Sequence, residues 1–194
     1  MALAAGIYMN PCRLFESGSG NVFFGTKRFD RTERGRLHMH SAAGMLNDNY
    51  RYSSMDYGNL MDATFRLEND VAGHEKILRI AAFNVFAHNR DDHSKNISYL
   101  MDAAGNWQLA PAYDLTYSNS SHGMHSTTIA GEGANPTRNH LMALAKEFSL
   151  KSGALILEKV ADAVSQWKSF AKDAGVTKAS ADIIEKKIQA SLKA

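Results

Sequence analysis

Cysteine is nearly absent from this sequence, with Cys12 alone among 194 residues. A single cysteine cannot form a disulfide within the chain, so the small disulfide-stapled secreted folds are excluded. The first residues also lack the basic segment and long apolar run that mark a secretory leader. Both absences favour a protein of the reducing cytoplasm.

Long apolar runs and a strong charge of one sign are absent as well. No stretch reaches the roughly 18 apolar residues that a spanning helix needs, and the most apolar segment is interrupted at His88. A net charge of +2 argues for neither nucleic acid nor membrane as a partner. With 44% hydrophobic and 22% charged residues, the chain can build one globular core.

Two segments have the pattern of β-hairpins. Residues 12–16 and 22–29 flank a turn of Ser, Gly and Asn, and residues 97–101 and 107–110 flank a second turn that contains Gly105. Both patterns are typical of two short strands that pair directly. We therefore predict two small hairpins.

Helices account for most of the remaining chain. Asp70 is a candidate N-cap for an almost wholly apolar helix that ends at Phe86, which should be central and buried. Residues 32–57 indicate short helices joined by loops, and residues 119–136 indicate a long polar loop with a functional role. From Leu141 onward the periodicity is helical, with one continuous face from Ile156 to Ala171. The prediction is a mainly α fold.

The polar loop after the buried helix carries the candidate chemistry. Asp91 precedes Asn96 by five residues, and the hairpin that follows should bring Asn96 and Asp114 to the same end. Phosphoryl transfer needs a carboxylate that accepts a proton from the attacking hydroxyl, and oxygen ligands that hold Mg²⁺. These three residues supply both.

Other interpretations of this loop remain open. Asp, Asn, His and Ser are also what solvated turns use. His88 and His93 beside Asp91 suggest a metal hydrolase, although no H-E-x-x-H pattern is present. The combination of the loop with the hairpin and Asp114 favours phosphoryl transfer.

Three motifs resemble the HipA family of serine/threonine kinase toxins. These are the loop at 89–96, the segment at 109–115, and the run at 27–31, which is similar to the family's arginine-phenylalanine-aspartate-arginine element at the nucleotide hinge. The resemblance extends over essentially the whole chain. It implies the helical large lobe of a protein-kinase-like fold, with 1–31 as hairpin and hinge and 32–194 as the catalytic lobe.

The resemblance also implies site roles. Asp91 would be catalytic, and Asn96 and Asp114 would bind Mg²⁺. Phe29 and Asp30 would lie against the adenine and ribose of ATP.

Two further positions in the loop are candidates for contact with the nucleotide. His93 and Lys95 would fix the loop or approach phosphate. Asp92 is one residue out of register with Asn96, so we expect it to support the loop.

The resemblance implies partners too. Members of the family phosphorylate proteins, including aminoacyl-tRNA synthetases, and meet DNA through a HipB-like antitoxin. The glycine-rich phosphate loop and the small-lobe lysine of the family are not found before the first hairpin, and Gly18 and Gly20 belong to a plain turn. We therefore expect a separate N-terminal kinase lobe to complete the site. A non-catalytic module that binds an antitoxin or a second subunit is the alternative.

A basic cluster follows the first hairpin. Its members are interspersed with Asp30 and Glu33. The cluster could face phosphate or form a solvated loop, and the sequence favours neither. It comprises Lys27, Arg28, Arg31, Arg34 and Arg36.

Overall fold

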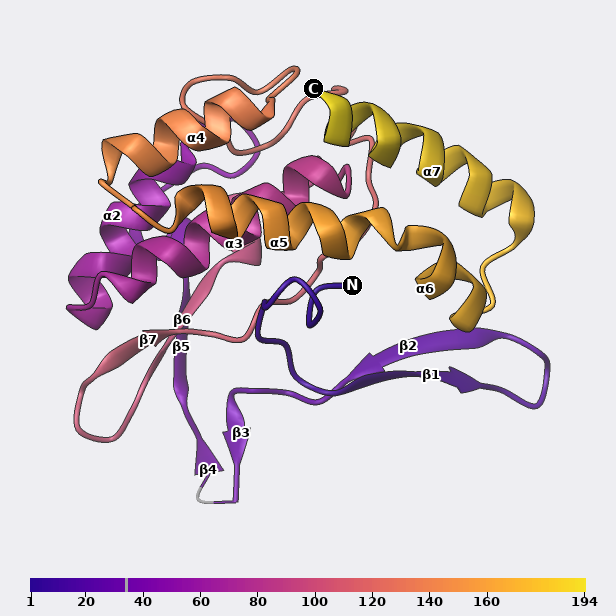
Figure 1. Cartoon of the computed structure of the whole chain (residues 1–194). Coiled ribbons are helices and arrows are strands. Elements are labelled where there is room, and N and C mark those ends of the chain that lie inside the picture. The colour runs from indigo at the N-terminus through magenta and orange to yellow at the C-terminus, as the bar shows by residue number, and fades with distance from the viewer. Residues whose placement is uncertain (34) are drawn as a thin grey trace.

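The computed structural model describes residues 1–33 and 35–194, so Arg34 of the basic cluster lies outside the described residues (Figure 1). The strands are β1 Cys12–Glu16, β2 Val22–Thr26, β3 Arg31–Thr32, β4 Gly35–Arg36, β5 His38–Ser41, β6 Ser98–Met101 and β7 Trp107–Leu109. The helices are α1 Ala42–Met45, α2 Tyr57–Glu68, α3 Ala72–Phe86, the 3₁₀ helix η1 Ser94–Asn96, α4 Arg138–Glu147, α5 Gly153–Ser165, α6 Trp167–Asp173 and α7 Lys178–Lys193. The predicted mainly α fold with small antiparallel sheets is confirmed.

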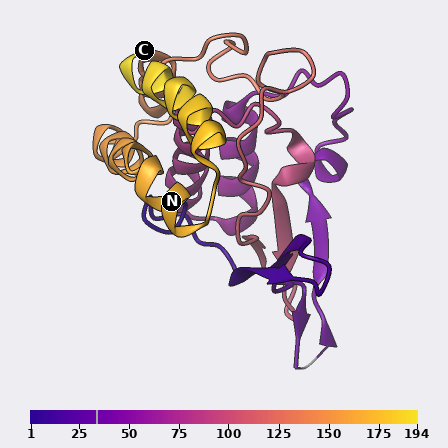
Figure 2. The same cartoon turned by 90° about the vertical axis from the view of Figure 1, so that its right-hand side faces the viewer.

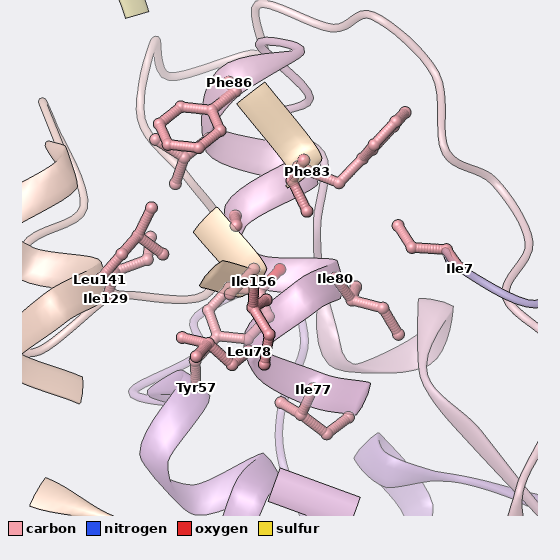
Figure 3. Packing of buried hydrophobic residues seen from close by; sticks show 14 of the residues in the cluster. Ile7, Tyr57, Ile77, Leu78, Ile80, Phe83, Phe86, Ile129, Leu141 and Ile156 are labelled. Atoms are coloured by element: carbon pink, nitrogen blue, oxygen red, sulfur yellow. The ribbon is translucent and has the colours of Figure 1, made fainter. Parts of the chain in front are cut away.

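Helix α3 is the centre of the helical part. Its side chains from Ile77 to Phe86 are buried on nearly every side, and α2 and α5 pack against it (Figures 1 and 3). Asp70 Oδ1 accepts a hydrogen bond from the backbone N–H of Ala72 at 2.9 Å, which satisfies a free donor at the start of the helix. The prediction of a central, buried helix is confirmed, whereas the N-cap position is taken by Val71, one residue after the predicted Asp70.

Helix α2 was not predicted. Its buried residues are Tyr57, Leu60, Met61, Ala63 and Thr64, most of them at the helical spacing of three and four residues. Asp56 caps this helix, because its Oδ1 accepts from the N–H of Gly58 at 2.8 Å. The polar residues between these positions conceal the apolar face in the sequence.

The expectation of short helices and loops at 32–57 is wrong for its first part. Strand β5 pairs antiparallel with β6, with Met39 opposite Leu100, so the second hairpin becomes a three-stranded sheet in the order β5-β6-β7. A further small ladder joins β3 and β4. The partner of β5 lies about sixty positions away in the chain, which no local pattern reveals.

The first hairpin is present as predicted, although β2 ends at Thr26 and leaves Phe29 in a bend. The continuous helical face from Ile156 to Ala171 is broken, because α5 ends at Ser165 and α6 begins at Trp167. Trp167 Nε1 donates to the carbonyl of Ala181 in α7 at 3.1 Å, which orients α6 toward the last helix.

The layers separate clearly in the side view. The long helices pack together on one side, and the strands lie on the other with the short helices α1 and η1 beside them (Figure 2). Within the described residues, no helix combines the length and apolarity that crossing a membrane takes.

Leu78 offers a direct test of this core. It is fully buried on α3, so Leu78→Ala is expected to lower the free energy of unfolding by about 2–5 kcal/mol because it leaves a cavity. Urea denaturation followed by circular dichroism measures the change. Leu155→Ala on α5 is the matched control, since Leu155 is 73% exposed and its loss should cost less than about 0.5 kcal/mol. Equal effects of the two substitutions would contradict the packing.

Candidate functional site

The loop that follows α3 closes on itself. His88 has φ +55°, a left-handed conformation that ends the helix and redirects the chain. Asn96 Nδ2 then donates to the backbone carbonyl of Asp91 at 3.0 Å. The five-residue spacing noted in the sequence is therefore the spacing of two residues bonded across one loop.

The β6–β7 hairpin brings Asn96 and Asp114 into one small pocket. Both residues line a pocket of about 10 Å³, together with Asn84, Asn89 and His93. Asp114 has φ +56°, so the chain turns sharply at this residue. A cavity of this volume accommodates one water-sized particle, not a nucleotide.

Asp91 lies beside this pocket but does not line it. Its side chain is 53% exposed, and its Oδ1 is 3.9 Å from Nε2 of His93. His93 is itself a wall of the pocket. Asp91 is thus accessible to a hydroxyl group on another molecule while it remains next to the oxygen groups of the pocket.

Asp92 has the opposite environment. Its side chain is 1% exposed, and its carboxylate accepts hydrogen bonds from Tyr57 Oη at 3.0 Å, His125 Nδ1 at 2.8 Å and the N–H of Ser126 at 2.8 Å. A carboxylate with these partners is an internal anchor. The geometry agrees with the supporting role expected for Asp92.

Tyr113 links the segment 27–31, which the sequence analysis expects to be the hinge, to this loop. Its ring centroid is 5.6 Å from that of Phe29, and its hydroxyl group donates to the carbonyl of Lys95 and is bonded to Ser98 Oγ at 2.6 Å. Burial raises the pKa of Tyr113 above its ordinary value, so the hydroxyl stays protonated and remains a donor. Tyr113 contacts both Phe29 and the loop, and the next residue, Asp114, lines the pocket. Tyr113 therefore connects these three parts of the site.

Two predicted site residues have their polar groups engaged outside the pocket. Asp30 accepts from Arg28 Nε at 2.7 Å and is 3.2 Å from Arg31 Nε, and the hydrogen bond from Arg28 lowers the pKa of Asp30 to about 2. Lys95 Nζ is 3.5 Å from the ring centroid of Tyr50, a cation–π contact. Asp30 therefore braces the hinge, and Lys95 lies against the 47–54 loop.

The oxygen atoms of the pocket suit a magnesium ion. Among the described residues, Asn89 Oδ1 is buried without a hydrogen-bond partner, and Asn96 Oδ1 and the Asp114 carboxylate accept no hydrogen bond. Within that part of the chain there is no group of three His, Cys, Asp or Glu that could hold a metal. Magnesium takes one or two protein oxygens and completes its shell with water and phosphate, so this small set fits it better than zinc.

A second, larger cavity opens beside the hinge. It has a volume of about 790 Å³ and is lined by Lys27, Arg28 and Phe29 together with residues of α3 and β7. It shares Ile80 and Ala112 with the small pocket. Its volume falls within the usual range of small-molecule sites.

Four residues of the site were not predicted from the sequence. They are Tyr57, Asn84, Asn89 and His125, all buried and all in the hydrogen-bond network around Asp92. Asn84 carried a usable signal, since it is an amide among the apolar residues of α3. His125 carried none, because it lies in a long polar segment without periodicity.

Comparisons with known proteins place these features in a family. The structure is similar to a chain of the Shewanella oneidensis MR-1 toxin–antitoxin complex of HipA, HipB and its operator DNA, with a TM-score of 0.80 and 18% sequence identity. The match covers 99% of this chain and 53% of that chain, so this chain spans about half the length of the protein that it matches. At this identity the likeness shows the fold alone.

Sequence comparison gives two results. No curated protein matches the chain closely enough to count as a relative. The HipA-like C-terminal domain family matches residues 1–190, nearly the entire sequence. The chain therefore belongs to the HipA-like C-terminal domain family.

Proposed function

We propose that this chain is the catalytic portion of an ATP-dependent serine/threonine protein kinase of a HipA-type toxin–antitoxin system, the large lobe of a protein-kinase-like fold. One observation carries the proposal. Asn96 and Asp114 line a metal-sized pocket directly beside the exposed carboxylate of Asp91. Phosphoryl transfer requires both a base for the attacking hydroxyl and ligands for a metal ion at the phosphates.

In this proposal Asp91 acts as the general base. It orients the serine or threonine hydroxyl of a protein substrate and accepts its proton while the oxygen attacks the γ-phosphorus and the bond to the ADP oxygen breaks. Asn96 and Asp114 would hold Mg²⁺ through their side-chain oxygens, and the ion would supply positive charge against the phosphates of ATP.

The remaining predicted residues position the nucleotide and the loop. Phe29 offers its ring to adenine at the edge of the large cavity, and Asp30 keeps the hinge in shape through Arg28 and Arg31. His93 lines the pocket next to Asp91, and its buried Nδ1 has no hydrogen-bond partner among the residues that the structure describes. We assign His93 to phosphate contact and Lys95 to the support of the loop through Tyr50.

The proposed partners follow the family and the structural neighbour. That neighbour forms a complex with HipB and operator DNA, so we propose a HipB-like DNA-binding antitoxin as partner and contact with DNA only through that complex. We propose a protein substrate of the kind that the family phosphorylates, such as an aminoacyl-tRNA synthetase. A cytoplasmic location is part of the same proposal.

The β1–β2 hairpin supports the need for an N-terminal kinase lobe. It projects from the rest of the molecule (Figure 1), and Leu14, Val22, Phe23 and Phe24 on it are each more than half exposed. An isolated two-stranded hairpin is only marginally stable in water, and apolar side chains gathered on it mark an interaction surface. We propose that the N-terminal lobe covers this hairpin and supplies the phosphate-binding loop and lysine.

Replacement of the proposed metal ligands tests the function. In a protein that joins this chain to an N-terminal kinase lobe, Asp114→Asn is expected to raise the Mg²⁺ concentration for half-maximal phosphate transfer by about tenfold or more, since a carboxylate ligand loses its charge. Transfer of labelled phosphate at increasing Mg²⁺ measures it. Asp62→Asn on α2, at a carboxylate 51% exposed and paired with Arg66, should leave the requirement unchanged. An unaltered Mg²⁺ requirement in Asp114→Asn would remove Asp114 from the site.

The non-catalytic alternative makes a different prediction. A module that only binds an antitoxin would keep full antitoxin affinity in Asp114→Asn and Asp91→Asn, and would transfer no phosphate in any form. Measuring transfer and antitoxin binding on the same variants separates the two functions.

A further inference from the structure

A buried chain of hydrogen bonds runs through the site and is not part of the proposed chemistry. It begins at His125 Nδ1, which donates to Asp92 Oδ2 at 2.8 Å. The hydroxyl group of Tyr57 donates to the same oxygen at 3.0 Å and accepts from Asn84 Nδ2 at 2.8 Å. All four residues in this series of hydrogen bonds are buried.

The chain of hydrogen bonds continues to Asp114. Asn84 Oδ1 accepts from Asn89 Nδ2 at 3.0 Å, and the same Nδ2 also lies 3.4 Å from the backbone carbonyl of Asp114. The hydrogen-bond network therefore extends from Asp92, next to Asp91, to the backbone of Asp114. Asp92 adjoins the proposed base, and Asp114 is a proposed metal ligand.

The segment 118–128 is held to the loop by backbone contacts as well. The N–H of Ser126 donates to the carbonyl of Arg90 at 3.1 Å, and the N–H of Arg90 donates to the carbonyl of Ser118 at 3.1 Å. Thr127 Oγ1 donates to the carbonyl of Asp92 at 2.7 Å. The segment 118–128 therefore lies beside the loop and is joined to it at Arg90 and Asp92.

Because Asp92 is buried, the hydrogen bonds between the segment 118–128 and the loop depend on its carboxylate. Burial, followed by the nearby Asp92 carboxylate, raises the pKa of Tyr57 well above its ordinary value, so the phenol remains a donor. The Asp92 carboxylate collects that donor, His125 and the N–H of Ser126. If one partner is removed, polar groups are left buried without partners, and exposure of the segment to water relieves this cost.

We propose that Asp92 and His125 are positioning residues that fasten the segment 118–128 onto the loop 91–96 and so fix the base Asp91 and the ligand Asp114 for catalysis. The fastening itself is independent of the proposed kinase activity, whereas its consequence for the rate rests on that activity. Docking of the segment would then be a requirement for an active site.

Hydrogen–deuterium exchange of this chain tests the fastening without any assay of activity. Asp92→Asn is expected to speed amide exchange in 118–128 and 89–96 by about tenfold or more, while amides in α5 exchange as in the unaltered chain. Unchanged exchange in both segments would overturn the proposal. Uniform acceleration that includes α5 would also count against it, because it would mean global loss of stability.

Two substitutions of His125 separate packing from hydrogen bonding, because the two effects predict opposite orders of amide exchange rate in the variants. His125→Asn keeps a side-chain N–H near the position of Nδ1, whereas His125→Leu keeps the volume and removes the donor. If the bond to Asp92 fastens the segment, exchange in 118–128 should stay close to normal in His125→Asn and rise in His125→Leu. The reverse order would mean that His125 only fills space and would overturn its role. His122→Leu, at an exposed histidine of the same segment, should change nothing.

The rate consequence is measured in a protein that joins this chain to an N-terminal kinase lobe. His125→Leu should lower kcat for phosphate transfer by about tenfold or more with a smaller change in KM for ATP, and His125→Asn should restore most of the loss. Faster exchange with normal kcat would overturn the positioning role. If even the unaltered protein transfers no phosphate, the proposed function fails, and the exchange results alone decide whether Asp92 and His125 hold the segment.

Discussion

Asp91→Asn is expected to lower the rate of phosphate transfer by about 10² to 10⁴, the usual contribution of general-base catalysis. The amide has nearly the shape of the carboxylate but cannot accept the proton of the attacking hydroxyl. The Asp91 side chain is 53% exposed, and the bond from Asn96 goes to its backbone carbonyl, so the substitution should leave the loop intact. Binding of Mg²⁺ and ATP should therefore change little.

The measurement uses labelled ATP and a serine-containing protein substrate, in a protein that joins this chain to an N-terminal kinase lobe. Calorimetry of ATP binding on the same variant separates chemistry from affinity. Asp62→Asn is again the matched control, with an exposed carboxylate. Retention of more than about a tenth of the rate in Asp91→Asn would rule out Asp91 as the base.

The 194 residues alone are expected to transfer phosphate at least about 10²-fold more slowly than the same residues with an N-terminal kinase lobe. The sequence contains no glycine-rich loop or small-lobe lysine ahead of β1, and these groups neutralise and enclose the phosphates in kinases. Asp91, Asn96 and Asp114 supply only the base and the metal ligands. Without a cover, water screens the electrostatic stabilisation of the transferring group.

Calorimetry and transfer of labelled phosphate, each with and without an added N-terminal lobe, test this expectation. We expect weak binding of ATP by the chain alone and a clear gain of both affinity and rate on addition. The same addition should bury the side chains of Phe23 and Phe24, which are 58% and 65% exposed. Rapid turnover by the chain alone would mean that a segment within it, such as the turn at Gly18 and Gly20, covers the phosphates.

Local patterns were sufficient for much of the fold. The helix α3, the β1–β2 hairpin and the β6–β7 hairpin follow from apolar runs and turn residues that neighbour one another in the chain. Strand β5 was missed because its pairing with β6 depends on residues far away in the sequence. The break at Gln166 was missed because the residue pattern does not reveal the contact between Trp167 and Ala181 in α7. Helix α2 was missed because its apolar face is diluted by polar neighbours.

The spacing of residues in the sequence also predicted that two of the proposed site residues lie close together. The placement of Asn96 and Asp114 in one pocket follows from their positions at the two ends of an antiparallel hairpin. Spacing could not indicate that Asp30 and Lys95 turn toward Arg28 and Tyr50, because side-chain direction is set by which charges and rings lie within reach. Their proposed roles now concern the shape of the hinge and the loop.

The sequence by itself determined the family, the mainly α character and the identity of the three residues proposed for chemistry, since each depends on residue type at short and fixed spacing. Only the tertiary structure decided the environments of the two adjacent carboxylates, with Asp91 53% exposed and Asp92 1% exposed beside His125. The reason is that burial and hydrogen bonding arise from contacts between residues as distant as Tyr57, Asp92 and His125. Those contacts exist only once α2, the loop and the segment 118–128 have packed around α3.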